Sequence, residues 1–153
     1  MTLAYVALGA NLGQARATVL RAMDDLAVLP RTRLVARSSL YRSAPVDASG
    51  PDFINAVVAI DTELVPEALL LEMQRIELRA GRERPYRNAP RTLDLDLLHH
   101  GDVHMATPAL TLPHPRMAER AFVLLPLAEI APSRVTPAQL ARVADQVIER
   151  LHG

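Results

Sequence analysis

The chain contains no cysteine, no tryptophan and no lysine among its 153 residues. The absence of cysteine excludes disulfides, thiolate metal sites and a cysteine nucleophile. Because lysine is absent, all 17 basic residues are arginine, and 17 acidic residues balance them. The resulting net charge of zero argues against a general nucleic-acid binder, which needs a broad positive surface. It leaves room for a local arginine pocket that binds a polyphosphate.

Long apolar runs are also missing, and none approaches the length of a membrane span. The first eight residues lack the basic start and extended apolar stretch of a signal peptide. We therefore expect a soluble, cytoplasmic protein that binds neither membrane nor nucleic acid and acts as a monomer. Half of the residues are apolar, which is enough for one packed domain over residues 1–153.

Three familiar phosphate-binding motifs are absent from the sequence. There is no Gly-x-x-x-x-Gly-Lys-Ser/Thr loop, no kinase lysine, and no Gly-x-Gly-x-x-Gly after a strand. The spacing of Gly9 and Gly13 is too short for the first motif and lacks its lysine. A phosphoryl-group transferase with this sequence would belong to none of those classes.

Apolar periodicity and turn residues predict an alternation of strands and helices. Strands are expected over 3–8, 34–41, 53–62 and 93–99, and helices over 14–28 and 66–79. This order, βαββαβ, is that of a ferredoxin-like α+β fold, an antiparallel sheet covered on one face by two helices.

A helical extension is expected to follow the last core strand. Residues 101–114 are predicted to be irregular or a small hairpin, and residues 116–131 to be helical with a break at Pro126. Thr136 is expected to cap a final helix. The apolar stripe predicted for that helix comprises Leu140, Val143, Val147 and Leu151.

The most informative segment alternates leucine with aspartate. Because side chains alternate along a strand, Leu93, Leu95 and Leu97 are expected to point into a core. Asp94 and Asp96 then point together to the other face, about 7 Å apart by strand rise. Such a pair is often only a solvated strand face, but it also suits Mg²⁺, which takes one or two protein carboxylates.

Arginines gather just before this segment, in the predicted loop 81–90. Arg82, Arg84 and Arg87 lie in the loop, and Arg91 follows it. The loop is either an ordinary solvated one or a segment that closes over a phosphate chain. On the preceding helix Gln74 and Glu77 share a polar edge that would suit a nucleotide, although an exposed helix face has the same pattern.

Two further groups of residues favour a ligand site. His114 lies between two prolines, and Arg120 follows about one helical turn later. Phe53 and Phe122 are the only phenylalanines; either they pack in the core, or they hold a flat heterocycle by stacking. Asn55, on the same strand face as Phe53, offers the donors and the acceptor that a pteridine or purine edge would need.

Several blocks in order resemble 6-hydroxymethyl-7,8-dihydropterin pyrophosphokinases, which act in folate biosynthesis. The blocks are Ala7-Leu-Gly-Ala-Asn-Leu12, Ser38-Ser-Leu-Tyr-Arg-Ser-Ala-Pro45, Pro51-Asp-Phe-Ile-Asn-Ala56, Gln74-Arg-Ile-Glu-Leu78, Gly81-Arg-x-Arg84, Arg87-Asn-Ala-Pro-Arg-Thr-Leu-Asp-Leu-Asp-Leu-Leu98 and Leu112-Pro-His114. The resemblance covers nearly the whole chain. It implies transfer of pyrophosphate from ATP to the hydroxymethyl group of the dihydropterin, giving AMP and the pterin diphosphate.

The resemblance also implies roles for individual residues. Asp94 and Asp96 would hold two Mg²⁺ ions, and Arg82 and Arg91 would join them as catalytic residues. The nucleotide set would be Gln74, Glu77, Arg82, Arg84, Arg91, Thr111, His114 and Arg120. The pterin set would be Ser43, Ala44, Val46, Phe53, Asn55 and Phe122.

Some members of the family carry other residues where this chain has Asn88, Ala109 and Pro115. Contacts to ATP are therefore expected to differ in detail.

Two alternative functions stay open at this point. A ferredoxin-like binding module without chemistry would need no paired carboxylates, and RNA would be repelled by them. A degenerate pyrophosphokinase would not need the intact aspartate pair, His114 and the arginines.

Overall fold

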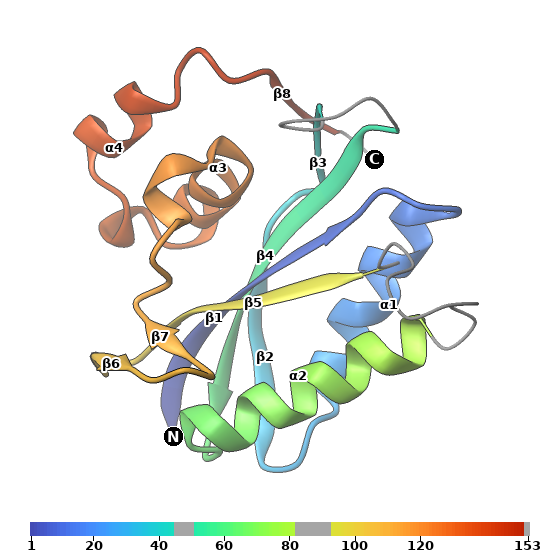
Figure 1. Cartoon of the computed structure of the whole chain (residues 1–153), viewed down its shortest axis with the longest axis vertical. Coiled ribbons are helices and arrows are strands. Elements are labelled where there is room, and N and C mark those ends of the chain that lie inside the picture. The colour runs from blue at the N-terminus through green and yellow to red at the C-terminus, as the bar shows by residue number, and fades with distance from the viewer. Residues whose placement is uncertain (45–50, 82–92, 152–153) are drawn as a thin grey trace.

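Strands and helices alternate in the computed structural model, which describes residues 1–44, 51–81 and 93–151 (Figure 1). The strands are β1 Thr2–Ala10, β2 Thr32–Arg37, β3 Tyr41–Ser43, β4 Phe53–Thr62, β5 Asp94–His100, β6 Met105–Ala106, β7 Thr111–Leu112 and β8 Ile148–Arg150. The α-helices are α1 Ala15–Ala27, α2 Pro66–Ala80, α3 Ala121–Ile130 and α4 Pro137–Arg142, with short 3₁₀ turns at η1 Met117–Glu119 and η2 Pro132–Arg134.

One six-stranded antiparallel sheet organises these elements. Its order is β5-β1-β4-β3-β8, and β2 also pairs with β4 beside β3. The strand predicted over 34–41 is divided, because Ser38 turns its hydroxyl to the Val57 N–H at 2.9 Å and interrupts the edge. The other predicted core strands and the first two helices are confirmed. The predicted small hairpin is β6–β7.

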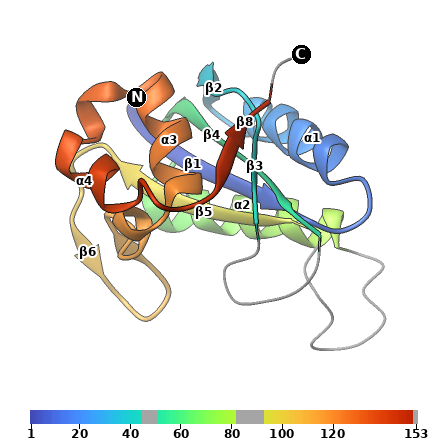
Figure 2. The same ribbon diagram turned by 90° about the horizontal axis from the view of Figure 1, so that it is seen from above.

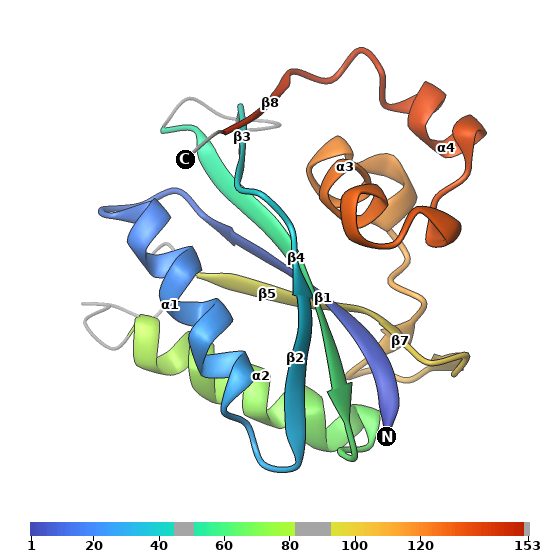
Figure 3. The same ribbon diagram turned by 180° about the vertical axis from the view of Figure 1, so that it is seen from behind.

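The first face of the sheet is covered by α1 and α2 (Figure 3). The buried residues of α1 are Val19, Ala22, Met23 and Leu26, at the helical spacing of its apolar positions. In α2 the buried side chains are Leu69, Met73 and Ile76. They share one core with the inward-facing leucines of β5.

The second face is covered by α3, which belongs to the helical extension expected after the last core strand. The two helices expected on one face are present, but the sequence did not predict where the extension would pack. Leu124 and Leu127 of α3 pack in a second apolar cluster with Ala7, Val57 and Leu98 of the sheet. The reason is visible in β1 and β4, whose central residues form continuous apolar runs. Such runs, without alternation, are typical of strands buried on both faces.

The predicted break at Pro126 is also wrong. Helix α3 runs unbroken through this residue, although proline removes one backbone hydrogen bond from a helix interior. Val123, Leu124 and Leu127 around it are almost fully buried. Packing on these sides of the helix outweighs the local cost of proline, as tertiary context often does.

The last predicted helix is shorter than expected. Thr136 caps α4, as predicted. The cap is a capping box, because Gln139 N donates to the Thr136 hydroxyl and the Gln139 side chain accepts from Thr136 N. The helix ends at Arg142, however, and the chain continues to β8, which pairs with β3 (Figure 2). Pairing with the open edge of β3 outweighs the helical apolar pattern of this segment. Among the described helices, none is long and apolar enough to cross a bilayer.

Glu129, near the end of α3, ties this second layer to the sheet. Its carboxylate accepts hydrogen bonds from Ser39 N and Ser39 Oγ, both at 3.0 Å, and from the Tyr41 hydroxyl at 2.8 Å. Arg150 of β8 lies 3.4 Å away. Burial raises the pKa of Glu129, but these partners outweigh it and the net pKa is lowered. Burial and the Glu129 carboxylate raise the pKa of Tyr41 to about 12.

We expect Glu129→Gln to lower the free energy of unfolding by about 1–2 kcal/mol at neutral pH, since charge-assisted bonds are lost at a partly exposed site. Because the folded pKa lies below the unfolded one, this contribution is present above about pH 4.3 and is lost as the pH falls through the folded pKa. Urea unfolding from pH 3 to pH 8 measures it. Glu149→Gln is the matched control, because within the described part of the chain the Glu149 carboxylate makes an exposed 4.0 Å ion pair with Arg42. Equal effects of the two substitutions would contradict this role for Glu129.

Candidate active site

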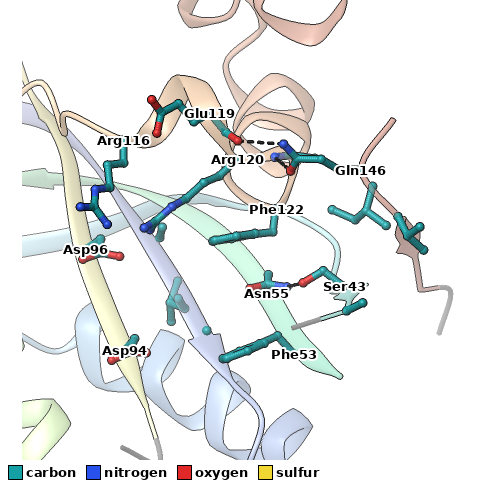
Figure 4. Close-up of a pocket in the computed structure, with 17 residues that line it drawn as sticks. Ser43, Phe53, Asn55, Asp94, Asp96, Arg116, Glu119, Arg120, Phe122 and Gln146 are labelled. Atoms are coloured by element: carbon teal, nitrogen blue, oxygen red, sulfur yellow. Dashed lines mark hydrogen bonds between the residues drawn. The ribbon is translucent and has the colours of Figure 1, made fainter. Parts of the chain in front are cut away.

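A cavity of about 1030 Å³ opens where the ends of β1, β4 and β5 meet the segment before α3 (Figure 4). The residues predicted for the site that line it are Ser43, Ala44, Phe53, Asn55, Asp94, Asp96, Arg120 and Phe122. They come from three separate strands, β3, β4 and β5, and from the start of α3. The sheet therefore brings together residues that are far apart in the sequence.

Alternation along β5 separates its leucines from its aspartates. Leu93, Leu95 and Leu97 are 2%, 6% and 2% exposed in the core. Asp94 and Asp96 point the other way and both line the cavity. The expected division of this strand into an apolar face and an acidic face is present.

Glu77 of α2 holds the strand between the two aspartates. Its Oε2 accepts a hydrogen bond from the Leu95 N–H at 2.8 Å. Among the described strands, β5 lies at the edge of the sheet beside β1, so none of them pairs with this N–H on its outer side. Glu77 therefore fixes the backbone from which Asp94 and Asp96 project.

His114 lies next to the acidic face. Its Nε2 is 3.7 Å from Asp96 Oδ1, and its Nδ1 accepts from the Arg116 N–H at 3.2 Å. An Nδ1 that accepts leaves the proton of the neutral ring on Nε2, directed toward Asp96. The backbone N–H of His114 also donates to Leu98 O at 3.0 Å, which anchors this loop to β5.

Positive charge approaches the aspartates from the segment before α3. Figure 4 shows Arg116 and Arg120 extending toward Asp96. The Arg120 guanidinium carbon is also 5.5 Å from the centre of the Phe122 ring, a cation–π distance. Arg116 was not predicted as a site residue, although its place two residues after His114 was a usable signal.

The other half of the cavity is aromatic and amide-lined. Figure 4 shows Phe53 and Phe122 on either side of the Asn55–Ser43 pair. Asn55 is 3% exposed, and its Nδ2 donates to Ser43 Oγ at 2.7 Å. This bond fixes the direction of the amide, and a flat ring between the two phenyl groups would meet the edge of Asn55.

Gly9 lies between the two halves of the cavity. In the sheet it is opposite Asn55 on β4 and Asp94 on β5. A Cβ at this position would be 3.3 Å from Asn55 Oδ1, which is closer than an ordinary contact. Because glycine has no side chain, the space between the Asn55 amide and the aspartates stays open. Only the pairing register of β1 reveals this role of Gly9.

Other predicted residues are not brought to the cavity. Gln74 is exposed on α2 and Thr111 lies in β7, and neither lines it. Val46, Arg82, Arg84 and Arg91 lie outside the described residues, as does most of the loop predicted over 81–90.

An acidic pair beside arginines, next to a slot for a flat ring, suits a transferase that moves a phosphate-containing group from a nucleotide to a heterocycle. Comparison with known proteins makes the class specific. The chain belongs to the 7,8-dihydro-6-hydroxymethylpterin-pyrophosphokinase (HPPK) family, whose sequence profile matches residues 5–132.

The similarity to known pyrophosphokinases extends over nearly the whole chain. The 2-amino-4-hydroxy-6-hydroxymethyldihydropteridine pyrophosphokinase of Pseudomonas aeruginosa is 48% identical over 156 residues, covering 97% of this chain and 96% of that protein. The enzyme of the same name from Haemophilus influenzae is 45% identical over 138 residues, covering 90% and 86%.

Solved structures show the same fold at low sequence identity. The HPPK-DHPS of Plasmodium falciparum matches with a TM-score of 0.65 and 15% identity over 86% of this chain. This chain spans 40% of the length of that protein. The likeness therefore concerns the fold of one part of a longer chain.

Proposed function

We propose that this chain transfers pyrophosphate from ATP to the hydroxymethyl group of 6-hydroxymethyl-7,8-dihydropterin, giving AMP and the pterin diphosphate for folate biosynthesis. It is then a 2-amino-4-hydroxy-6-hydroxymethyldihydropteridine diphosphokinase. The observation that carries this proposal is the cavity, in which two aspartates and two arginines meet two phenylalanines and a buried asparagine. The 48% and 45% sequence identity to two pyrophosphokinases, over most of the chain, supports it.

The aromatic half would bind the pterin. Phe53 and Phe122 would stack on its two faces, and Asn55 would bind its polar edge. Ser43 would hold the Asn55 amide in place through their 2.7 Å hydrogen bond. Ala44 and Val46, from the chain beyond β3, complete the proposed pterin set.

The acidic half would bind Mg²⁺ together with the ATP phosphates. Within the described ranges no group of three or more His, Cys, Asp or Glu side chains is placed to hold a metal. The pair Asp94 and Asp96 nevertheless fits Mg²⁺, which takes one or two protein carboxylates and fills its other positions with water and phosphate oxygens. We propose that they hold two ions. When bound to these carboxylates, Mg²⁺ would supply positive charge against the phosphate oxygens.

The reaction needs the hydroxymethyl oxygen to reach the β-phosphorus of ATP. A bond forms between these atoms, the bond from the β-phosphorus to the bridging oxygen of AMP breaks, and the hydroxyl proton passes to water. Arg120 would stabilise the negative charge on the transferred group, with His114 beside it. Arg82, Arg84 and Arg91 are proposed to embrace the triphosphate, and Gln74, Glu77 and Thr111 to contact the nucleotide.

We also propose that the sheet is of the ferredoxin-like kind and that residues 1–153 act as one domain. Counting β2 and β3 as one strand, the order β5-β1-β4-β2/β3 is that of the split βαβ arrangement. We propose that the protein acts as a monomer, because one chain supplies both the acidic and the aromatic half of the cavity. Use of ATP as co-substrate supports a cytoplasmic location.

The direct test is product analysis with purified protein, ATP, Mg²⁺ and hydroxymethyl-dihydropterin. We expect AMP and the pterin diphosphate in equal amounts, and neither product when EDTA replaces Mg²⁺. Formation of ADP and a pterin monophosphate would mean single phosphoryl transfer instead. Pterin binding without any AMP would favour the binding module.

Gly9→Ala tests the link between the two halves of the cavity. The added Cβ would press on Asn55 Oδ1, so we expect pterin affinity to fall roughly 3- to 10-fold. Affinity for a non-hydrolysable ATP analogue should change much less, because that ligand does not meet Asn55. Titration of each ligand separately measures both effects. Unchanged pterin affinity would show that Gly9 does not shape the ring site.

A further inference from the structure

The C-terminal segment forms one wall of the cavity, although it lies beyond the end of the family profile. The family profile ends at residue 132, whereas Gln146, Val147 and Ile148 all line the cavity. Ile148 is paired with Ser43 across β8 and β3. Val147 is an exposed apolar side chain in this wall, with 78% of its surface accessible.

Gln146 makes two long-range hydrogen bonds within this wall. Its Oε1 accepts from the Ala121 N–H at 2.9 Å, and its Nε2 donates to Glu119 O at 2.8 Å. These two backbone groups lie on either side of Arg120 (Figure 4). One side-chain amide therefore holds the backbone on both sides of this arginine.

The first of these bonds substitutes for a missing helix cap. Arg120 is the N-cap residue of α3 and makes no capping hydrogen bond with its side chain. The first N–H groups of a helix have no partner within the helix. Gln146 supplies one for Ala121, and Phe122 is the next residue of the helix.

We infer that Gln146 is a positioning residue of the pterin site, which sets the direction of Arg120 and Phe122 through their backbone. The inference rests on the proposed function, because it concerns the same cavity. The Arg120 guanidinium carbon lies 5.5 Å from the centre of the Phe122 ring. Because Ala121 joins these two residues, a shift of its backbone moves both side chains.

The segment is anchored well enough to act in this way. Leu151 N donates to Leu40 O at 2.8 Å, and Arg150 Nε donates to Ser39 Oγ at 3.0 Å. These bonds hold the chain after Gln146 to the sheet. Before it, Gln146 N donates to Val143 O at 3.0 Å, and Val143 is buried against α3. Gln146 is thus held from both directions.

The test compares Gln146→Met with Gln139→Met. Methionine keeps the length of the side chain and removes both hydrogen bonds at position 146. Gln139 likewise accepts from a backbone N–H at the start of a helix, that of the N-cap residue Thr136. It does not line the cavity, so it is a matched control. Gln146→Glu keeps the acceptor for Ala121 N–H and loses the donor to Glu119 O, and it serves as the partial rescue.

We expect Gln146→Met to weaken pterin binding roughly 3- to 10-fold and to lower kcat, the loss typical of one or two partly exposed hydrogen bonds. Gln146→Glu should lie between this variant and the wild type. Gln139→Met should bind pterin normally, even if its thermal midpoint falls as much as that of Gln146→Met. Pterin fluorescence, which no tryptophan obscures in this chain, gives the dissociation constants.

Wild-type pterin affinity and kcat in Gln146→Met would overturn the inference, as would an equal loss in Gln139→Met. Failure of the proposed function has a different signature. In that case Phe122→Ala would also leave pterin binding unchanged, or the wild-type protein would not bind pterin. Loss of binding in Phe122→Ala with none in Gln146→Met would reject only the role of Gln146.

Discussion

Asp96→Ala should fold normally and bind pterin almost as well as the wild type, but lose turnover by roughly 10²–10⁴-fold. The carboxylate is on the face of β5 that points into the cavity, so its removal costs no core packing. Its proposed work is to hold Mg²⁺ against phosphate oxygens, and this charge stabilisation matters most in the transition state. Single-turnover measurement of AMP formation, alongside equilibrium pterin binding, separates the two effects.

Asp61→Ala is the control for Asp96→Ala. Asp61 is also on a strand of the sheet, and its partner is the exposed Arg33 at 3.1 Å. Such surface pairs contribute little to stability, and Asp61 does not line the cavity. Near-normal turnover in Asp96→Ala, or an equal loss in Asp61→Ala, would remove the metal assignment from this strand.

Residues with a local signal were predictable from the sequence. The alternation of leucine and aspartate in β5 is a period-two pattern, and the structure separates the two sets onto opposite faces. The apolar positions of α1 and the capping box at Thr136 are likewise contained in short stretches of sequence. A metal site was predictable from β5 because Asp94 and Asp96 point to the same face of this strand.

The remaining features depend on contacts between distant segments. Gly9 is informative only because the register places it opposite Asn55 and Asp94. Gln146 reaches backbone groups 25 and 27 residues away, so nothing near it in the sequence indicates its partners. The spacing of Val147 with other apolar residues predicted a helix, but pairing of β8 with β3 determined the outcome.

The sequence contains a signal for the second helical layer that the predicted fold did not use. The continuous apolar runs of β1 and β4 required cover on both faces of the sheet. Helix α3 provides that cover, and this packing brings Arg120 and Phe122 to the cavity. The aromatic half of the site therefore depends on a layer that the predicted fold contained only as an unplaced extension.

Phe122→Ala should weaken pterin binding by about 1–3 kcal/mol, or roughly 5- to 150-fold, as expected from the loss of one stacking face. The ring lines the cavity and is only partly buried against the second core, so the thermal midpoint should fall little. Binding of an ATP analogue should weaken less, through the loss of the 5.5 Å contact with Arg120. Titrations that follow pterin fluorescence measure the main effect.

Phe122→Tyr is the control that keeps the aromatic face and adds only a hydroxyl. Its pterin affinity should stay within a few-fold of the wild type, whereas Phe122→Leu should resemble alanine more closely because it cannot stack. This order separates stacking from simple loss of apolar volume. If alanine lowers the thermal midpoint strongly while pterin affinity holds, Phe122 is a core residue. Another part of the cavity wall would then have to contact the pterin face assigned to Phe122.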